Sequence, residues 1–370
     1  MALNVPEIDF GDLSPGRFHE EIVATARPFV LRGLLADWPV VTAGKAGPEA
    51  LAACLKSYDR GARIGVKTAP PAERGRLFYD ESLTAFNFDK AEMTLSMALD
   101  RLLAASAGAE GSLAVQSVQA RHAVPGFAEA HPMPLLPEST APRLWIGSAV
   151  TVAAHYDPVD NLACVAGGKR CFTLFPPDQV ANLYPGPFET TPAGPIVSMV
   201  DFDAPDMARY PGFAAALETA MTAELSPGDA IYIPAMWWHH VRSIEPLNML
   251  VNYWWSSAAA HHPPAAPALL HAMLAIKHLP APQREAWRAL FDHYAFMPDG
   301  PPGLHLAPAQ RGIQGEISEE AAQSVRGTIL RSLAQPALPT RAHRLRNVAG
   351  RLWRRLHPHP GAHWRDNHSK

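Results

Sequence analysis

The sequence has few cysteines, little excess of either charge and no long apolar run. Its three cysteines, Cys54, Cys164 and Cys171, show no CxxC spacing, which favours buried thiols in a reducing compartment over disulfides or a zinc site. The formal net charge of -3 gives no general attraction to nucleic acid or anionic lipid. No apolar run approaches the roughly 18 residues of a membrane span. Acidic residues stand where a signal peptide would have its basic start. We therefore expect a cytoplasmic protein without nucleic-acid or membrane partners.

Proline, by contrast, is abundant, and its 37 residues are spread along the chain. This distribution favours many short elements joined by turns. Residues 1–111 have the pattern of mixed helices and strands. Between 112 and 256, short apolar runs such as PRLWIGS, AVTVAAHYD and KRCFTLFPP are separated by Gly, Pro, Asp and Asn, as in an antiparallel sandwich or barrel. The chain is therefore predicted to be mainly β with flanking helices.

The chain after residue 256 changes character. Apolar residues recur at helical spacing over 257–340, which predicts a C-terminal helical region. Residues 341–370 are basic, and they contain apolar residues at helical spacing, Leu345, Val348, Leu352 and Leu356. We interpret this last segment as a solvated tail or a subunit-packing helix rather than a nucleic-acid arm.

A pair of metal-ligating residue types lies in the β-rich part. His155 and Asp157 are two residues apart in a strand-like run, so their side chains point to the same face. Such groups are costly to bury unless something compensates them. One more histidine would complete the set of two histidines and one carboxylate that is typical of non-haem Fe(II) oxygenases. His239 and His240 are both candidates, and strand alternation alone does not choose between them.

A lone cation follows this pair along the chain. Lys169 begins a strand on which Cys171 and Thr173 share its face. A single ammonium group inside a barrel needs an anionic partner, and the distal carboxylate of 2-oxoglutarate is a suitable one. The alternative is that Lys169 and Arg170 are solvated turn residues after Gly167-Gly168.

Ordered motifs over much of the chain resemble one enzyme family. They are AAHYDPVDNLACVAGGKRCFTLFPPDQVANLYPGP, VDFDAPD, YPGF, PGDAIYIPAMWWHHVRS and VNYWW. Together they resemble the cupin-like branch of the JmjC oxygenases, and within it the asparaginyl hydroxylases. The resemblance is dense from about 143 to 256. It implies a double-stranded β-helix (jelly-roll or cupin) core.

The same resemblance implies roles for individual residues. His155, Asp157 and His239 would hold Fe(II), with His240 as a neighbour of the site. Lys169 would bind the carboxylate of 2-oxoglutarate. Other residues that would contact the co-substrate or line its pocket are Asn161, Asn252, Thr173 and Trp254.

Two positions depart from the family pattern. Val152 stands where the family has a threonine, and Leu113 lies near the position of a tyrosine that helps to hold the co-substrate. The candidates to supply a hydroxyl instead are Thr151, Thr173 and Ser117.

The function implied by the resemblance is that of an Fe(II)- and 2-oxoglutarate-dependent dioxygenase, which uses O₂ to hydroxylate a C–H bond. A protein or peptide side chain is the expected substrate, with a free amino acid or another small molecule as the alternative. Demethylation of methyl-lysine is a close chemical variant. The resemblance also implies a homodimer built by C-terminal helices.

Two other functions stay open. The first is a non-catalytic cupin that serves as a binding module. The second is a metal-dependent cupin isomerase or hydrolase that needs no keto acid. The four tryptophans near the site are expected to pack in the core and pocket wall rather than to stack on nucleic acid; they are Trp237, Trp238, Trp254 and Trp255.

Overall fold

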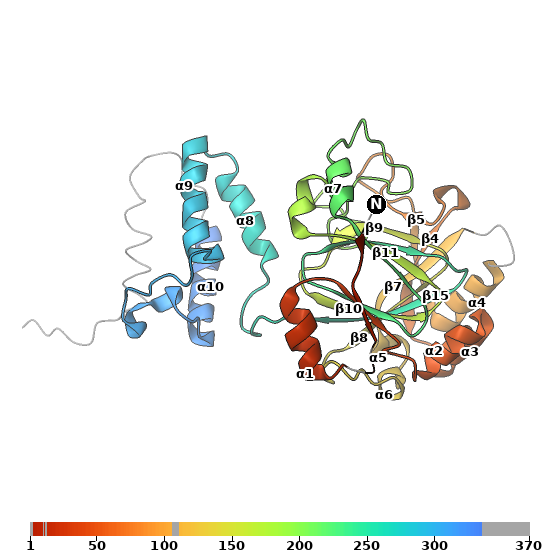
Figure 1. Cartoon of the computed structure of the whole chain (residues 1–370). Helices are drawn as coiled ribbons and strands as arrows, with labels where there is room; N and C mark the ends of the chain where they lie inside the picture. Colours follow the sequence, from red (N-terminus) through yellow and green to blue (C-terminus); the bar gives the residue numbers. More distant parts are fainter. Residues whose placement is uncertain (1–2, 10, 12, 106–110, 335–370) are drawn as a thin grey trace, which may run out of the picture. The chain divides into compact units, whose positions relative to one another are not determined.

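The structure is a computed structural model that describes residues 3–9, 11, 13–105 and 111–334. The chain divides into two compact units, Met1–Ser257 and Ala258–Lys370 (Figure 1). The basic segment predicted at 341–370 lies outside the described residues. None of the helices in the described ranges combines the length and apolar content needed to span a bilayer.

Two mixed β-sheets form the first unit. The six-stranded sheet has the order β1 (Leu3–Asn4), β12 (Met221–Leu225), β11 (Arg170–Phe175), β14 (Trp238–Ser243), β9 (Thr151–Tyr156), β5 (Arg76–Leu77). The nine-stranded sheet has the order β2 (Glu7–Asp9), β3 (Phe29–Arg32), β13 (Ala230–Ile233), β10 (Asp160–Gly167), β15 (Asn248–Trp255), β8 (Pro142–Gly147), β7 (Ser112–Gln119), β4 (Arg63–Ala69), β6 (Asp89–Thr94).

Strands β8 to β15 switch between the two sheets in the manner of a jelly roll, except that the consecutive strands β11 and β12 pair within the smaller sheet. β8, β10, β13 and β15 belong to the larger sheet, and β9, β11, β12 and β14 to the smaller. All pairings among these eight strands are antiparallel. The predicted mainly β core with flanking helices is confirmed.

Short helices surround these sheets. The α-helices of the first unit are α1 (Pro15–Arg17), α2 (Pro39–Ala46), α3 (Pro48–Tyr58), α4 (Leu95–Ala105), α5 (Ala120–Ala123), α6 (Phe127–Ala130) and α7 (Phe213–Thr219). Single turns of other helix types are η2 (Phe18–Ile22), η3 (Val23–Thr25), η4 (Pro71–Glu73) and η5 (Pro177–Ala181). The frequent prolines fit this pattern, because several of these helices begin at a proline, where the missing N–H costs nothing.

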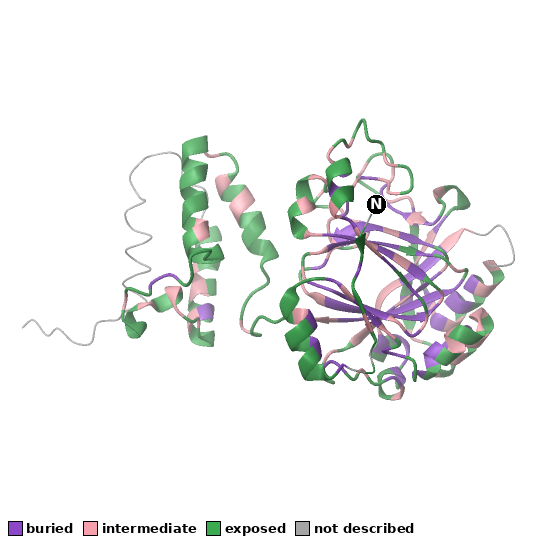
Figure 2. Cartoon of the chain, viewed as in Figure 1, coloured by how far each residue is buried: buried purple, intermediate pink, exposed green. Residues whose placement is uncertain are grey.

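The two faces of the larger sheet belong to different hydrophobic cores. On one face, Leu162 and Cys164 of β10 pack in a large cluster with Leu51 and Leu55 of α3. On the other, Ala163 and Val165 belong to a cluster that includes β11 and β14. β10 is therefore buried on both faces (Figure 2), which explains its continuous apolar run LACVA. A pocket lined by residues of both sheets, among them Ala163 of β10 and Phe172 of β11, lies on the second face.

The cysteines agree with the expected buried thiols only in part, and two of the four tryptophans pack as expected. All three cysteines are free thiols, although only Cys164 is buried. Trp238 is fully buried in the core, and Trp255 packs against Phe18 and Tyr232.

The second unit is helical. Its described elements are α8 (Ala266–Ile276), α9 (Ala281–Phe291), η6 (Asp292–Phe296), η7 (Pro308–Gln310), η8 (Gly312–Gln314) and α10 (Glu319–Leu333). Ser318 caps α10 by accepting a hydrogen bond from the Ala321 N–H. α8 and α9 contain no buried residue, and several of their leucines are exposed.

Candidate active site

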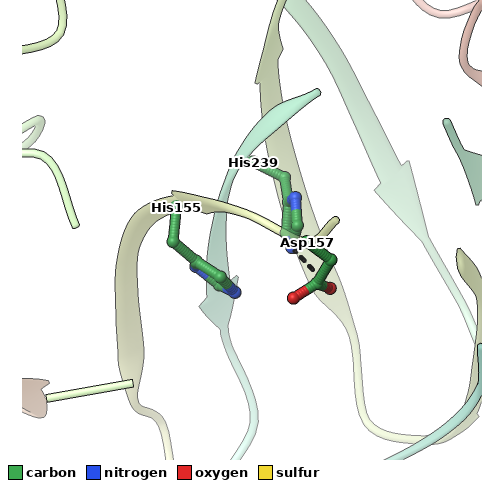
Figure 3. Close-up of side chains that lie close together, drawn as sticks. All are labelled: His155, Asp157 and His239. Atoms are coloured by element: carbon green, nitrogen blue, oxygen red, sulfur yellow. Dashed lines mark ion pairs between the residues drawn. The ribbon is translucent and has the colours of Figure 1, made fainter. Parts of the chain in front are cut away.

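The neighbouring strands β9 and β14 bring together His155, Asp157 and His239 (Figure 3). His155 lies on β9 and Asp157 directly follows that strand, while the antiparallel register places His239 of β14 opposite His155. One ligand atom from each of the three lies within 4.8 Å of the other two, and all three side chains are buried. His240 has the opposite orientation and stacks on Phe202, with ring centroids 4.6 Å apart. The register thus selects His239 over His240.

Hydrogen bonds orient both histidine rings for metal binding. The Nδ1 atom of His155 lies 2.9 Å from the carbonyl oxygen of Ala153, and that of His239 lies 3.0 Å from the carbonyl oxygen of Trp237. Since a carbonyl can only accept, each Nδ1 carries the proton and each Nε2 keeps its lone pair. Burial and the neighbouring His155 also lower the pKa of His239, which favours the neutral form that ligates metals. Two neutral imidazoles and a carboxylate suit a divalent transition metal.

A chain of amide side chains supports the third ligand. The Oδ2 atom of Asp157 lies 3.7 Å from Nε2 of His239 and accepts a hydrogen bond of 3.3 Å from Nδ2 of Asn161. Oδ1 of Asn161 in turn accepts a hydrogen bond of 2.8 Å from Nδ2 of Asn252. The predicted residues Asn161 and Asn252 are therefore both at the site, where they orient the carboxylate.

A single pocket contains the triad and runs between the two sheets. Apart from the triad it is mostly apolar. The residues that line it are Trp145, Val152, His155, Asp157, Asn161, Ala163, Arg170, Phe172, Ile233, His239, Val241, Leu250, Asn252 and Trp254. Trp254, which was predicted to pack near the active site, is among them.

Lys169 does not reach this pocket, so its predicted contact with 2-oxoglutarate needs correction. Its side chain is 49% exposed, and Nζ lies 3.8 Å from Oε1 of Glu224. Gly168, with a φ of +69°, makes the tight turn before β11, where a Cβ atom would come within 2.3 Å of Oδ1 of Asn248. The face that Lys169 shares with Thr173 points away from the pocket, so the predicted role of Thr173 is corrected as well.

Arg170 is the cation that lies in the pocket. It begins β11 and shares its buried face with Phe172 and Leu174. Only 5% of Arg170 is exposed, and none of the ion pairs among the described residues involves it. Its Nη2 lies 3.5 Å from the carbonyl oxygen of Trp145, and its Nε has no hydrogen-bond partner. Burial lowers the pKa of Arg170 to about 10, as expected for a cation whose charge nothing offsets.

Among the described residues that line the pocket, none supplies a hydroxyl group in place of those missing at Val152 and Leu113. Val152 lines the pocket, whereas Leu113 packs in the large core against the helices. Thr151 and Ser117 are not among the lining residues, and Oγ of Ser117 accepts a hydrogen bond from Arg143. The pocket therefore has no serine, threonine or tyrosine among its lining residues.

Sequence reasoning missed Arg170 and Trp145. The signal for Arg170 was present in RCFTLF, where Arg170, Phe172 and Leu174 alternate with Cys171 and Thr173. Trp145 gave a weaker signal, because a tryptophan in a strand is more often a packing residue than a hydrogen-bond donor.

Comparison with known proteins gives both a family and individual relatives. The family model described as "Cupin-like domain" matches residues 15–261. HSPB1-associated protein 1 of Homo sapiens is 33% identical over 150 residues, which cover 39% of this chain and 30% of that protein. Lysine-specific demethylase JMJ31 of Arabidopsis thaliana is 37% identical over 113 residues, covering 30% of this chain and 20% of the relative.

A longer match is to the Bifunctional peptidase and (3S)-lysyl hydroxylase JMJD7 of Homo sapiens. It is 27% identical over 285 residues, or 69% of this chain and 84% of that protein. The alignments to HSPB1-associated protein 1 and to the demethylase thus span less than a third of each relative.

Proposed function

The chain belongs to the cupin-like domain family, and from this premise we propose that it is an Fe(II)- and 2-oxoglutarate-dependent oxygenase. The observation that carries the proposal is the buried convergence of His155, Asp157 and His239 in one pocket with an unpaired arginine. Bound together, iron, 2-oxoglutarate and O₂ would supply the oxidising chemistry, while the protein supplies orientation and an apolar enclosure.

The chain's own residues divide this work between them. Nε2 of His155, Nε2 of His239 and the carboxylate of Asp157 would hold the metal and leave coordination positions open for ligands. Asn161 and Asn252 keep the carboxylate oriented through the hydrogen bonds described above. The apolar lining limits the access of water to the reacting groups.

Arg170 takes the co-substrate role that the sequence suggested for Lys169. A guanidinium group presents parallel N–H donors that match the two oxygens of a carboxylate. On β11, Leu174 lies opposite His239 and Arg170 lies opposite Ser243. The separation of four positions corresponds to about 13 Å along the strand. A dicarboxylate bound between the metal and the guanidinium would span the part of this separation that the long arginine side chain does not.

For the reaction we propose hydroxylation of a C–H bond on a protein or peptide side chain. The names of two relatives, a (3S)-lysyl hydroxylase and a lysine-specific demethylase, support a protein substrate. They also keep demethylation as a chemical variant, and a small molecule or free amino acid remains the alternative substrate. The finer resemblance to asparaginyl hydroxylases stays a prediction.

Location in the cytoplasm and pairing into a homodimer through C-terminal helices are also proposals. The exposed leucines Leu269, Leu270 and Leu274 of α8 agree with a contact between subunits.

The test is the release of succinate from 2-oxoglutarate by the full chain, supplied with Fe(II) and O₂ and screened against peptide mixtures. Mass spectrometry of the peptides should find a gain of one oxygen atom or the loss of a methyl group. A protein that binds metal but releases no succinate with any substrate would instead be a binding module. Substrate conversion without 2-oxoglutarate would indicate an isomerase or hydrolase.

A further inference from the structure

The buried polar atoms that lack a partner are concentrated in the pocket. Among the described residues, five buried side-chain nitrogen or oxygen atoms have no hydrogen-bond partner. One is Nη2 of Arg76. The other four belong to residues that line the pocket, and they are Nε1 of Trp145, Nε of Arg170, Oδ1 of Asn252 and Nε1 of Trp254. Because unpaired buried polar atoms are rare in folded proteins, such a concentration indicates a place where a polar ligand binds.

These four atoms are spread along the pocket. Asn252 belongs to the amide chain that reaches Asp157, so it lies near the metal ligands. Trp254 pairs through its backbone with Asn161, and its ring contacts Trp145. Arg170 and Trp145 lie together farther along the pocket, where the guanidinium approaches the carbonyl oxygen of Trp145. We call Arg170 and Trp145 the anion end of the pocket.

The anion end offers donors and no acidic group. Nε of Arg170 and Nε1 of Trp145 can only donate hydrogen bonds, and no carboxylate pairs with Arg170 among the described residues, as noted above. The indole rings of Trp145 and Trp254 meet edge to face, with centroids 6.3 Å apart and an interplanar angle of 84°. This contact restricts the orientation of the Trp145 ring. The anion end therefore presents two unsatisfied N–H groups to whatever enters it.

We propose that Trp145 donates its indole N–H to the distal carboxylate of the 2-oxoacid co-substrate, beside Arg170, and so selects a dicarboxylate over a monocarboxylic 2-oxoacid. This inference rests on the proposed function and deepens it. Trp145 supplies here the neutral donor that a hydroxyl side chain would otherwise supply. With the N–H of Trp145, the distal carboxylate has both a charged and a neutral donor, although Val152 has no hydroxyl group.

The experiment compares two ligands that differ only in the distal carboxylate. Binding of 2-oxoglutarate and of 2-oxopentanoate is measured by calorimetry on the full chain, loaded with Mn(II) and kept free of oxygen. Trp145→Phe removes the N–H and keeps an aromatic ring. It should weaken 2-oxoglutarate binding about 10- to 100-fold, as for a lost hydrogen bond to a charged group. The affinity for 2-oxopentanoate should change far less. Trp255→Phe is the matched control, because its ring packs against Phe18 and Tyr232 and does not line the pocket, and it should leave both affinities unchanged.

The outcomes separate the two proposals. If the unaltered protein prefers 2-oxoglutarate and Trp145→Phe keeps that preference, the role of Trp145 is wrong and the oxygenase proposal stands. If the metal-loaded protein fails to bind 2-oxoglutarate and releases no succinate, the oxygenase proposal is itself wrong, and the role of Trp145 with it.

A measurement on the unaltered protein covers the case in which Trp145→Phe does not fold. The indole nitrogens of the nine tryptophans are labelled with ¹⁵N, and spectra are recorded with Zn(II) in the metal site. One indole N–H resonance should move downfield with 2-oxoglutarate and stay in place with 2-oxopentanoate. Indole resonances that respond equally to both ligands would overturn the inference.

Discussion

The two ends of the pocket differ in whether their polar side chains already have hydrogen-bond or ion-pair partners within the chain. At the metal end, each of His155, Asp157 and His239 has a hydrogen-bond partner that holds its orientation. At the anion end, Arg170 has one long contact to a carbonyl oxygen and no opposite charge. The metal end is thus organised before any ligand arrives, whereas the anion end needs one to offset its charge. Substitutions at the metal end should therefore weaken metal binding, whereas substitutions at the anion end should weaken binding of the co-substrate.

The largest expected effect is loss of the metal. Asp157→Ala and His239→Ala should each abolish tight Fe(II) binding and succinate release, because each removes one of three ligands. His240→Ala is the matched control. It should keep metal binding and measurable turnover, since His240 stacks on Phe202 instead. Metal content after dialysis, measured by elemental analysis, checks both. Loss of metal in His240→Ala but not in His239→Ala would contradict the assigned triad.

The second largest effect is expected at the anion end, on the binding of 2-oxoglutarate. Arg170→Ala should weaken 2-oxoglutarate binding about 10- to 100-fold or more, because it removes charge-assisted hydrogen bonds. Metal affinity should stay nearly unchanged. Lys169→Ala should leave both within about twofold, since Lys169 pairs with Glu224 at the surface. Calorimetry with the Mn(II)-loaded protein measures both affinities. A large effect of Lys169→Ala would restore the original prediction for that lysine.

A smaller effect should come from the groups that support the metal ligands. Asn161→Ala removes the hydrogen-bond donor to Asp157 and should lower metal affinity about 10-fold, at the low end of what such partners contribute. Competition with a chelating dye provides the measurement. Unchanged metal affinity in this variant would show that the carboxylate does not need its amide partner. The metal end would then be less fully organised than we infer.

The smallest effect lies outside both ends and concerns acid stability. Nε2 of the buried His131 accepts a hydrogen bond from the Val40 N–H, and its Nδ1 donates to the carbonyl oxygen of Phe127. Burial lowers the pKa of His131 below 6.5 in the folded protein. Folding therefore favours the neutral ring, so this contribution to stability is complete above pH 6.5 and declines as the pH falls below it. Urea unfolding at several pH values should show a shallower acid loss for His131→Gln, and an unchanged slope would contradict this assignment.

The sequence predicted the metal end better than the anion end, for physical reasons. The period of two along a strand places His155 and Asp157 on one face without any tertiary information. Choosing His239 over His240 requires the register between β9 and β14, which the residues of one strand do not contain. Alternation in KRCFTLF allows either Lys169 or Arg170 to be the inward cation, and both our reading of the strand and the family resemblance led to Lys169, one position before Arg170. A shift of one residue along a strand places the side chain on the opposite face of the sheet.

The hydroxyl candidates were misplaced for a related reason. Thr173 has the phase of Lys169 and so points outward with it. Ser117 lies at an irregularity in the pairing of β7 with β8 and has a φ of +57°. Such a local departure from regular alternation is set by the neighbouring strands. No pattern in the sequence could therefore show that the pocket would be lined by Trp145 and by none of the predicted hydroxyl groups.

Both ligand histidines are held by a carbonyl group two residues earlier in the chain, His155 by Ala153 and His239 by Trp237. The orientation of the two imidazole rings thus depends on short stretches of backbone in and next to two paired strands rather than on distant loops. Loops around the barrel could be exchanged to change what the protein recognises while the reactive centre stays intact. The chain is therefore a suitable scaffold for protein engineering, in which the loops are changed to alter selectivity while the metal site is kept.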